Sequence, residues 1–368
     1  MFVVKRILLA LNIIVALLLL ATYLPTHVFF GMNSFVSLLG YIYPIALILN
    51  IIFILLWLLI GSRWNIILSL ACIILHYDFV PRLYNLSFGK EEKENTLTIL
   101  SYNVEGFNHD INLFEDRQSK QDKQKENLDS IISIVANSKA DIVCFQDFVE
   151  NIACKENVHN RMTEGLKYRY HFHYYKIYNK RISDCVIYSK YFIRDAGNIT
   201  DSVENSTNIW ADILTPYGEL RVYNLHLLSY QLADDSKDTF SKLKSGDLND
   251  KSGIKTLAKK LVYADNKRKY QADNILNLIN DCEKPYIIVG DFNSIPFSYV
   301  YKQFNAVADD SFVKKGTGLG RTYNGIFPAY RIDYVLTHKD KVKTQSYQSK
   351  KVDFSDHHPI VVKFSIVK

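Results

Sequence analysis

Residues 286–293 read Tyr-Ile-Ile-Val-Gly-Asp-Phe-Asn, an apolar run that ends at Gly290 and leads directly into polar residues. A short apolar run that stops at a glycine is typical of a buried strand. Asp291 and Asn293 follow two residues apart, which puts both side chains on one face of an extended chain. A carboxylate there could act as a general base, and an amide could donate a hydrogen bond to a phosphate group. The structural alternative is an Asx turn that caps the loop.

Further segments of strand length lie on both sides of this run, and two segments have helical periodicity. Strands are predicted at residues 96–102, 142–145, 168–178, 185–188, 209–214, 220–225, 286–289, 332–336 and 360–364. Helices are predicted at residues 124–137 and 254–280. Many strands with few helices between them indicate an α/β fold in which two sheets carry helices on their outer faces.

Polar residues also stand at the ends of other predicted strands, where α/β enzymes place their sites. Asp356 and His357 precede the last strand, and an imidazolium there can offset charge that develops on a phosphoryl group. Asp333 begins an apolar strand and needs a partner, for which an imidazole N–H or Arg331 is suitable. His226 ends the strand that starts near residue 220, where a purely structural histidine is the alternative.

Two more strand ends carry oxygen-bearing side chains, Asn103 and Asp147. Mg²⁺ prefers oxygen ligands and often needs only one or two carboxylates. These two residues would supply such a set, although each alone is also compatible with a structural role.

Taken together, these segments resemble the endonuclease/exonuclease/phosphatase superfamily over about residues 97–364. The matching strings, in chain order, are LSYNVEGF, ADIVCFQD, CVIYSKY, VYNLHLLS, IIVGDFNSIP, RIDYVL and SDHHPIVV. The resemblance implies a four-layer α/β sandwich of two mixed β-sheets flanked by helices. It also implies a metal-dependent phosphoesterase, most often one that hydrolyses phosphodiesters.

The resemblance implies a role for each matching residue. Catalysis and phosphate contact are implied for Asp291, Asn293, His226, Asp333 and His357. In this set Asp291 orients or deprotonates the attacking water, and Asp333 positions His357. Metal binding, with Mg²⁺ or Mn²⁺ as the ion, is implied for Asn103, Asp147 and Asp356. The family usually has glutamate where this chain has Asp147, so the carboxylate is one methylene shorter.

Two other segments contain residues that suggest binding. The glycine-rich loop at residues 316–323 lacks a P-loop lysine, but Arg321 and Thr322 are candidate substrate contacts. His171 and His173 share one face of a predicted strand. An ordinary half-buried strand is expected there, with a second metal pair as the alternative.

The first 89 residues form a separate apolar region in which Lys5, Arg6, Arg63, Asp78 and Arg82 are the only charged residues. Apolar runs at residues 7–24 and 35–60 are long enough to cross a bilayer, and a third at residues 64–80 is marginal. We therefore expect a transmembrane anchor at 1–89, a linker at 90–96 and a catalytic domain at 97–368.

The basic residues of the anchor predict its orientation. Lys5 and Arg6 favour an inside N-terminus, the loop at 25–34 is uncharged, and Arg63 lies in a tight turn. With three spans, the catalytic domain faces the outside, whereas it faces the cytoplasm if the run at residues 64–80 does not cross. The resemblance to membrane-anchored bacterial members then implies a multi-pass protein of the bacterial inner membrane, with its catalytic domain in the periplasm.

The charge of the chain leaves the substrate open. Residues 90–368 carry 40 basic and 37 acidic residues, so this part lacks the strong positive charge of a general nucleic-acid binder. Nucleic acid and phospholipid both stay possible as substrates, the bilayer is the expected partner of the helices, and no protein partner is predicted. The alternative is a catalytically weakened or non-catalytic binding module that retains the fold, with Asp147 as the first sign of loss.

Overall fold

The structure is a computed structural model. It describes residues 2–27, 35–87, 94–107, 117–148, 158–178, 181–200, 207–230, 250–324 and 330–367, together with Thr239 and Lys242. The first residues of the predicted linker (90–93) and most of the uncharged loop at 25–34 therefore lie outside the described residues. The chain divides into two compact units, the first made of Met1–Tyr84, Leu232–Lys269 and Ser294–Gln303, and the second of the remainder.

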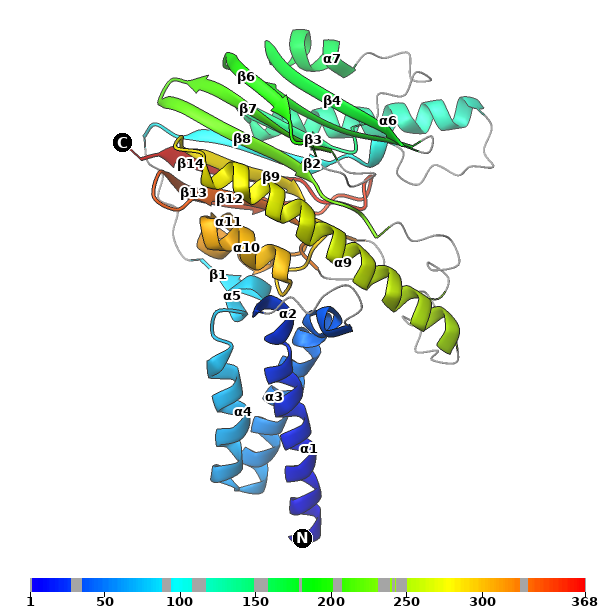
Figure 1. The fold of residues 1–368 in the computed structure, drawn as a ribbon, viewed down its shortest axis with the longest axis vertical. Helices are drawn as coiled ribbons and strands as arrows, with labels where there is room; N and C mark the ends of the chain where they lie inside the picture. The colour runs from blue at the N-terminus through cyan, green and yellow to red at the C-terminus, as the bar shows by residue number, and fades with distance from the viewer. Residues whose placement is uncertain are drawn as a thin grey trace. The chain divides into compact units, whose positions relative to one another are not determined.

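Two six-stranded mixed sheets form the centre of the second unit (Figure 1). The first sheet has the order β10 (Ala308–Asp310), β12 (Asp333–His338), β9 (Tyr286–Asp291), β8 (Gly218–His226), β7 (Thr207–Thr215) and β6 (Ile193–Asn198). The second has the order β13 (Val342–Ser349), β14 (Ile360–Ile366), β2 (Leu97–Asn103), β3 (Ile142–Gln146), β5 (Arg181–Ser189) and β4 (Tyr170–Tyr178). The predicted two-sheet α/β architecture is confirmed.

Successive side chains of the central strands point to opposite faces of their sheet, and this alternation produces the layers. Ile99 and Cys144 point into the core between the two sheets, where they meet residues of the first sheet such as Val289. Their neighbours Leu100 and Val143 point the other way, into a second core beneath a helix. Because both faces are buried, these strands are apolar throughout.

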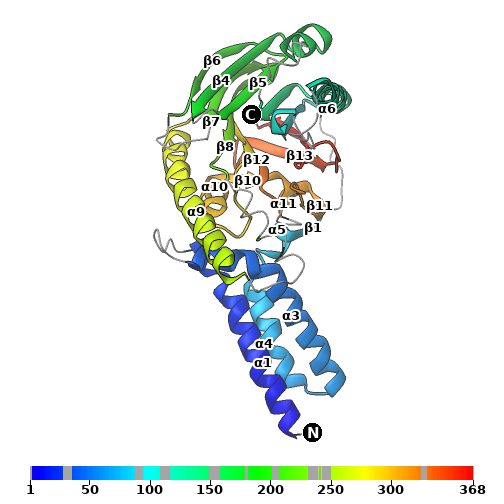
Figure 2. The same ribbon diagram turned by 90° about the vertical axis from the view of Figure 1, so that its right-hand side faces the viewer.

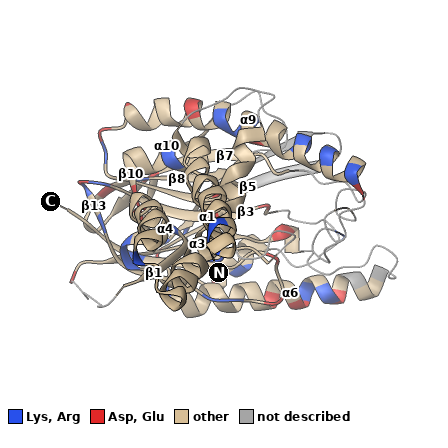
Figure 3. Cartoon of the chain, turned by 90° about the horizontal axis from the view of Figure 1, so that it is seen from below, with Lys and Arg blue, Asp and Glu red and all other residues tan. Residues whose placement is uncertain are grey.

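Helices cover the outer faces of the sheets. Helix α6 (Arg117–Ser138) contributes Leu128 and Ile131 to the core outside the second sheet. Residues 270–280 of helix α9 (Lys251–Asn280) lie against the first sheet, where the Tyr223 hydroxyl donates to the Leu278 carbonyl over 3.5 Å. Figure 3 colours Lys and Arg blue and Asp and Glu red, and charged residues of both signs recur along α6 and α9.

Shorter elements complete the second unit. They are η2 (Glu105–Phe107), α7 (Val158–Asn160), η3 (Arg161–Gly165), α11 (Ser311–Lys315) and the two-stranded sheet of β1 (Tyr84–Leu86) and β11 (Thr317–Leu319). Helix α10 (Tyr299–Val307) runs from the first unit into the second.

The N-terminal part of the first unit is a bundle of apolar helices, α1 (Phe2–Ala21), α3 (Leu39–Ile60) and α4 (Arg63–Leu75) (Figure 2). Short helices α2 (Leu24–His27), η1 (Phe35–Leu38) and α5 (Val80–Leu83) extend it. Two segments, Phe2–His27 and Phe35–Ile60, are long and apolar enough to span a membrane. The third, α4, has 13 residues and is shorter than a bilayer requires.

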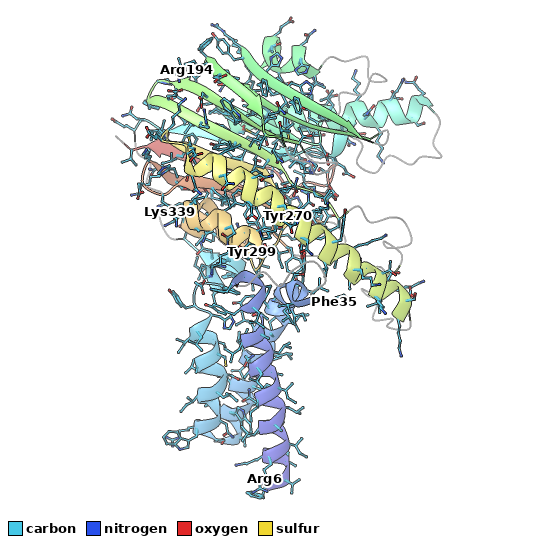
Figure 4. The ribbon with its side chains drawn as sticks, viewed as in Figure 1. Arg6, Phe35, Arg194, Tyr270, Tyr299 and Lys339 are labelled. Atoms are coloured by element: carbon cyan, nitrogen blue, oxygen red, sulfur yellow. The ribbon has the colours of Figure 1, made fainter. Side chains whose placement is uncertain are left out.

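Polar side chains tie the three helices together. The Asn12 carboxamide donates to the Ser69 hydroxyl over 2.6 Å and accepts from the Trp57 indole over 2.9 Å. These hydrogen bonds satisfy buried polar groups that would otherwise be costly among apolar helices. Arg6 lies near the free end of α1, as Figure 4 labels it, where a basic residue keeps its charge in water.

Residues 294–303 belong to the same unit as the bundle. The rings of Tyr43 and Phe297 have centroids 4.4 Å apart, and Phe79 lies 5.3 Å from Phe297. A Cβ atom on Gly40 would lie 2.7 Å from the Phe297 carbonyl oxygen, so the chains approach closely because this residue is glycine.

Candidate active site

Strand pairing in the first sheet places three candidate residues at one edge. β8 and β9 run parallel with His226 beside Asp291, and β12 runs antiparallel to β9 with Asp333 beside Asp291. In the second sheet β2 and β3 run parallel, so that Asn103 is paired with Gln146, the residue before Asp147. The carboxyl ends of parallel strands share an edge, and polar side chains gather there.

Asp291 lies at the centre of this group and is 1% exposed. One of its carboxylate oxygens accepts from the Asn103 carboxamide over 3.0 Å, and the other accepts from the Asn293 backbone N–H over 2.8 Å. The same Asp291 carboxylate lies 3.7 Å from His357 Nε2 and 3.9 Å from His226 Nε2. Side chains from three distant parts of the sequence therefore meet at one buried carboxylate.

His357 is fixed by Asp333, whose carboxylate oxygens lie 3.0 and 3.1 Å from the ring nitrogen Nδ1. An Nδ1–H that donates to Asp333 leaves Nε2 directed at Asp291 and at Asp356, whose Oδ1 is 3.8 Å away. The structure thus brings together the pair that the resemblance connected, and its catalytic role stays a prediction.

Burial and charge shift two pKa values within the site. Burial raises the pKa of Asp291 to about 6, the neighbouring Asp333 charge adds to this, and the two histidines oppose it. Burial alone would lower the pKa of His357, but the charges of Asp333, Asp356 and Asp291 outweigh burial and raise it well above 6.5. A carboxylate and an imidazolium with such shifted pKa values are typical of catalytic sites.

Asp147 is connected to the residues around Asp291 by a contact with His226. Its carboxylate lies 3.3 Å from His226 Nδ1, and its side chain is 37% exposed. Asp147 has a φ of 48°, in the left-handed region, so the backbone turns sharply where β3 ends. A chain of contacts therefore runs from Asp147 through His226 and Asp291 to His357.

The donor set suits a divalent cation. Among the described residues, one group of three potential ligand atoms lies within 4.8 Å of one another, from Asp291, Asp333 and His357. Asp356 Oδ1 and His226 Nδ1 are buried atoms without a hydrogen-bond partner, as groups that face an ion or its water would be. Oxygen donors predominate in the combined set, which fits Mg²⁺ or Mn²⁺.

Among the predicted metal ligands, Asn103 is oriented differently from what was expected. Asn103 directs its carboxamide nitrogen at Asp291, while its oxygen accepts from the Glu105 N–H over 3.0 Å. The side-chain oxygen expected to assist a metal is thus engaged with the backbone, because η2 turns the chain directly after β2.

Asn293 also makes contacts that the sequence did not indicate. It has a φ of 49°, and its carboxamide donates to the Leu227 carbonyl over 3.0 Å. A primary amide carries two N–H groups, so the second can still donate to a phosphate.

The two candidate substrate contacts lie in different surroundings. Thr322 is fully buried, and its hydroxyl oxygen accepts from the N–H groups of Ile332 and Asp333, each over 3.1 Å. Thr322 therefore supports the strand that carries Asp333, and its contact with a substrate stays a prediction. Arg321 is half-buried and donates to the Asn324 side chain over 2.6 Å.

Thr322→Val is expected to lower the free energy of unfolding by about 1–3 kcal/mol, because the buried Ile332 and Asp333 N–H groups lose their acceptor. Thr322→Ser is the matched control, since it keeps the hydroxyl. Urea unfolding measures the difference, and equal midpoints for the valine and serine proteins would contradict the assignment.

No role was predicted for Ser355 or for the buried pair of Gln146 and Asn224. The Ser355 hydroxyl accepts from the His357 N–H over 3.2 Å and lies 3.4 Å from the Asn103 carbonyl oxygen. Gln146 donates to the Asn224 side chain over 2.7 Å and so bridges the two sheets below the site. Asn224 was detectable as the polar residue two positions before His226, on the same strand face.

Comparison with known proteins gives a family match for each of the two parts of the chain. Residues 100–357 match the model of a family described as the Endonuclease/Exonuclease/phosphatase family. Residues 5–83 match a domain of unknown function, DUF8431. No curated protein sequence matches the chain.

Solved structures show the same fold at low sequence identity. The human Nocturnin catalytic domain with a bound sulfate anion has a TM-score of 0.50 at 15% identity, with 76% of this chain and 97% of that chain covered. An endonuclease/exonuclease/phosphatase from Bacteroides vulgatus has a TM-score of 0.50 at 15% identity, covering 74% and 100%. One from Beutenbergia cavernae has a TM-score of 0.50 at 12% identity, covering 74% and 72%.

Proposed function

Because the chain belongs to the Endonuclease/Exonuclease/phosphatase family, whose members act on phosphoester bonds, we propose that it is a divalent-metal-dependent hydrolase of phosphodiesters. The observation that carries this proposal is the meeting of His357 and His226 at the buried carboxylate of Asp291. A phosphoryl group needs a base for the attacking water and positive groups for its oxygens, and these residues supply both.

Each residue has a task in this proposal. Asp291 aligns the attacking water and accepts its proton, for which a pKa of about 6 is well placed near neutral pH. His357 donates through Nε2 to a non-bridging oxygen, and Asp333 holds its ring. Asn293 and His226 contact the remaining phosphate oxygens.

A metal ion would be held by Asp147 and Asp356, and Asn103 would assist only through the second lone pair of the side-chain oxygen that accepts from the Glu105 N–H. When bound, Mg²⁺ or Mn²⁺ supplies a Lewis acid that polarises the phosphoryl oxygen and stabilises the leaving oxygen. The buried, unpartnered Oδ1 of Asp356 supports this assignment.

The test is hydrolysis by the purified full-length chain in detergent. We expect bis(p-nitrophenyl) phosphate to be cleaved with Mg²⁺ or Mn²⁺ and not with EDTA. Abasic DNA, RNA, phosphoinositides and sphingomyelin, assayed in parallel, separate a nuclease from a lipid phosphodiesterase. Failure to cleave any phosphate ester with either metal would refute the proposal and favour a binding module.

We propose further that residues 1–89 anchor the protein in the bacterial inner membrane by several spans and that the catalytic domain, residues 97–368, faces the periplasm. Two apolar helices of sufficient length and the basic residues at the start of α1 support a membrane anchor with an inside N-terminus, and the periplasmic location requires α4 to cross as the third span. An alkaline phosphatase fusion at the C-terminus should be active. An inactive alkaline phosphatase fusion together with a fluorescent cytoplasmic reporter fusion would place the domain inside.

Asp147→Glu is expected to lower the Mg²⁺ concentration needed for half-maximal activity by ~3-fold or more, because the longer side chain reaches further toward the ion. The measurement is the initial rate against Mg²⁺ concentration. Asp353→Glu, at a side chain that is 90% exposed, is the matched control and should change nothing. A higher Mg²⁺ requirement in Asp147→Glu than in the wild type would contradict this role for Asp147.

A further inference from the structure

A group of histidine side chains lies in the second unit, around strand β4, apart from the candidate active site. His171 and His173 are two positions apart in β4, so their side chains share one face of the strand. Helix α7 places His159 beside them. The ring centroid of His159 lies 4.9 Å from that of His171 and 5.4 Å from that of His173. Three imidazoles from two separate elements therefore meet at one place.

These spacings match what a shared metal ion requires. Zinc binds histidine nitrogen at about 2.0–2.1 Å, usually with tetrahedral geometry, which places the centres of two coordinating rings about 5 Å apart. Among the described residues, only the group of Asp291, Asp333 and His357 already has its three ligand atoms within 4.8 Å of one another. At the histidine group the rings of His171 and His173 must turn about their Cβ–Cγ bonds toward His159, a movement that leaves the ring centres nearly where they are.

The surroundings of the rings are those of a histidine ligand site. The Tyr188 hydroxyl lies 2.5 Å from His159 Nδ1, and metal-bound histidines commonly have their other nitrogen hydrogen-bonded in this way. Phe148 packs on one side, with its ring centroid 5.7 Å from those of both His159 and His173. His171 is exposed, so an ion can enter from the solvent.

We propose that His159, His171 and His173 form a transition-metal site, with Zn²⁺ as the preferred ion, distinct from the oxygen-rich centre at Asp291. Imidazole donors select zinc, copper or nickel, whereas carboxylates and amides suit Mg²⁺ and Mn²⁺. The bound ion ties α7 to β4 beside Phe148, the residue that follows Asp147. The proposal does not depend on phosphodiester hydrolysis.

The test is calorimetric titration of the full-length chain in detergent with Zn²⁺. The Asp291→Asn background and excess Mg²⁺ keep Zn²⁺ from the oxygen-rich centre. We expect one Zn²⁺ to bind with micromolar or tighter affinity, and His171→Asn and His173→Asn each to weaken it at least ~10-fold, since each removes one of three ligands. Co²⁺ should give the visible spectrum of a tetrahedral site in the parent and not in the His171→Asn protein.

His338→Asn is the matched control, because His338 is a partly buried histidine of β12 outside the cluster. It should bind Zn²⁺ like the parent. Zn²⁺ should also raise the unfolding temperature of the parent and of His338→Asn but not that of His171→Asn, whose exposed side chain leaves folding intact. Equal Zn²⁺ affinity in the parent, His171→Asn and His173→Asn, or no Zn²⁺ binding by the parent, would overturn the proposal.

Discussion

Asp291→Asn is expected to lower phosphodiester turnover by about 10²–10⁴-fold and, in the same protein, to raise the stability of the metal-free fold. Loss of activity follows from the loss of the group that aligns and deprotonates water. The gain in stability follows from burial, because ionising a carboxylate that is 1% exposed costs more than the neighbouring histidines return. A residue that only supported the fold would show the opposite pattern.

The pH dependence of this gain follows from the raised pKa of Asp291. The pKa of Asp291 is about 6 in the folded state, and the ordinary pKa of an aspartate, which applies to the unfolded chain, is 3.8. Below pH 3.8 both states are protonated and the carboxyl group costs nothing. As pH rises from 3.8 to 6 the unfolded state releases its proton first, so stability falls, by on the order of 3 kcal/mol in total. The asparagine protein avoids this loss, so its advantage should be large at pH 8 and smaller at pH 5.

Thermal unfolding in EDTA at both pH values measures this difference. Asp333→Asn is the matched control, because it also removes a buried carboxylate from the site. His357 has a raised pKa through Asp333, so the pair stabilises the fold below pH 6.5, and that contribution is lost as pH rises through the folded pKa. Asp333→Asn should therefore be less stable than the wild type at pH 6. An Asp291→Asn protein that melts below the wild type at pH 8 would contradict the account.

Gly290→Ala is expected to destabilise the protein by more than about 3 kcal/mol, enough to prevent folding of a marginally stable domain. Gly290 has a φ of 130°, which side chains rarely adopt, and a Cβ there would lie 1.9 Å from the Leu225 carbonyl oxygen. That carbonyl belongs to the neighbouring strand β8, so the strands must separate. Asp291 and His226, which end these two strands, would then lose their contact.

Gly218→Ala is the matched control for this substitution. Gly218 has a φ of 132°, nearly the same as Gly290, but no atom lies within 4 Å of its hypothetical Cβ. The difference between the two alanine proteins isolates the steric clash from the backbone strain. Urea unfolding, or the yield of folded protein, measures it. Equal effects at both glycines would show that the close approach of β8 and β9 is not required.

The position of a strand within its sheet explains whether it could be predicted from the sequence. β2, β3, β9 and β14 have neighbours on both sides within their sheets, and their apolar runs were evident. β6, β10 and β13 were missed, and each lies at the edge of a sheet. Edge strands carry polar residues that face solvent, as in Val342–Ser349, so the apolar alternation that marks a strand is weak there.

Within the site, the sequence indicated residues that end strands but not the contacts between them. Asp291, His226 and Asp333 were detectable because a polar residue directly at the end of an apolar run is unusual. Ser355, which contacts the Asn103 carbonyl, and the buried hydroxyl of Thr322 serve the site through contacts between separate segments that only the folded chain creates. His159 likewise gave no signal, because it joins His171 and His173 only after α7 is placed over β4.

The central claim is that carboxylates, an amide and imidazoles from both sheets surround one divalent ion and one phosphoryl group. The most direct measurement is anomalous diffraction from crystals of the full-length protein soaked with Mn²⁺ and phosphate. The account predicts Mn²⁺ coordinated by Asp147 or Asp356 and phosphate oxygen within hydrogen-bonding distance of His357 Nε2. Phosphate and Mn²⁺ bound elsewhere, with this cluster empty, would contradict it.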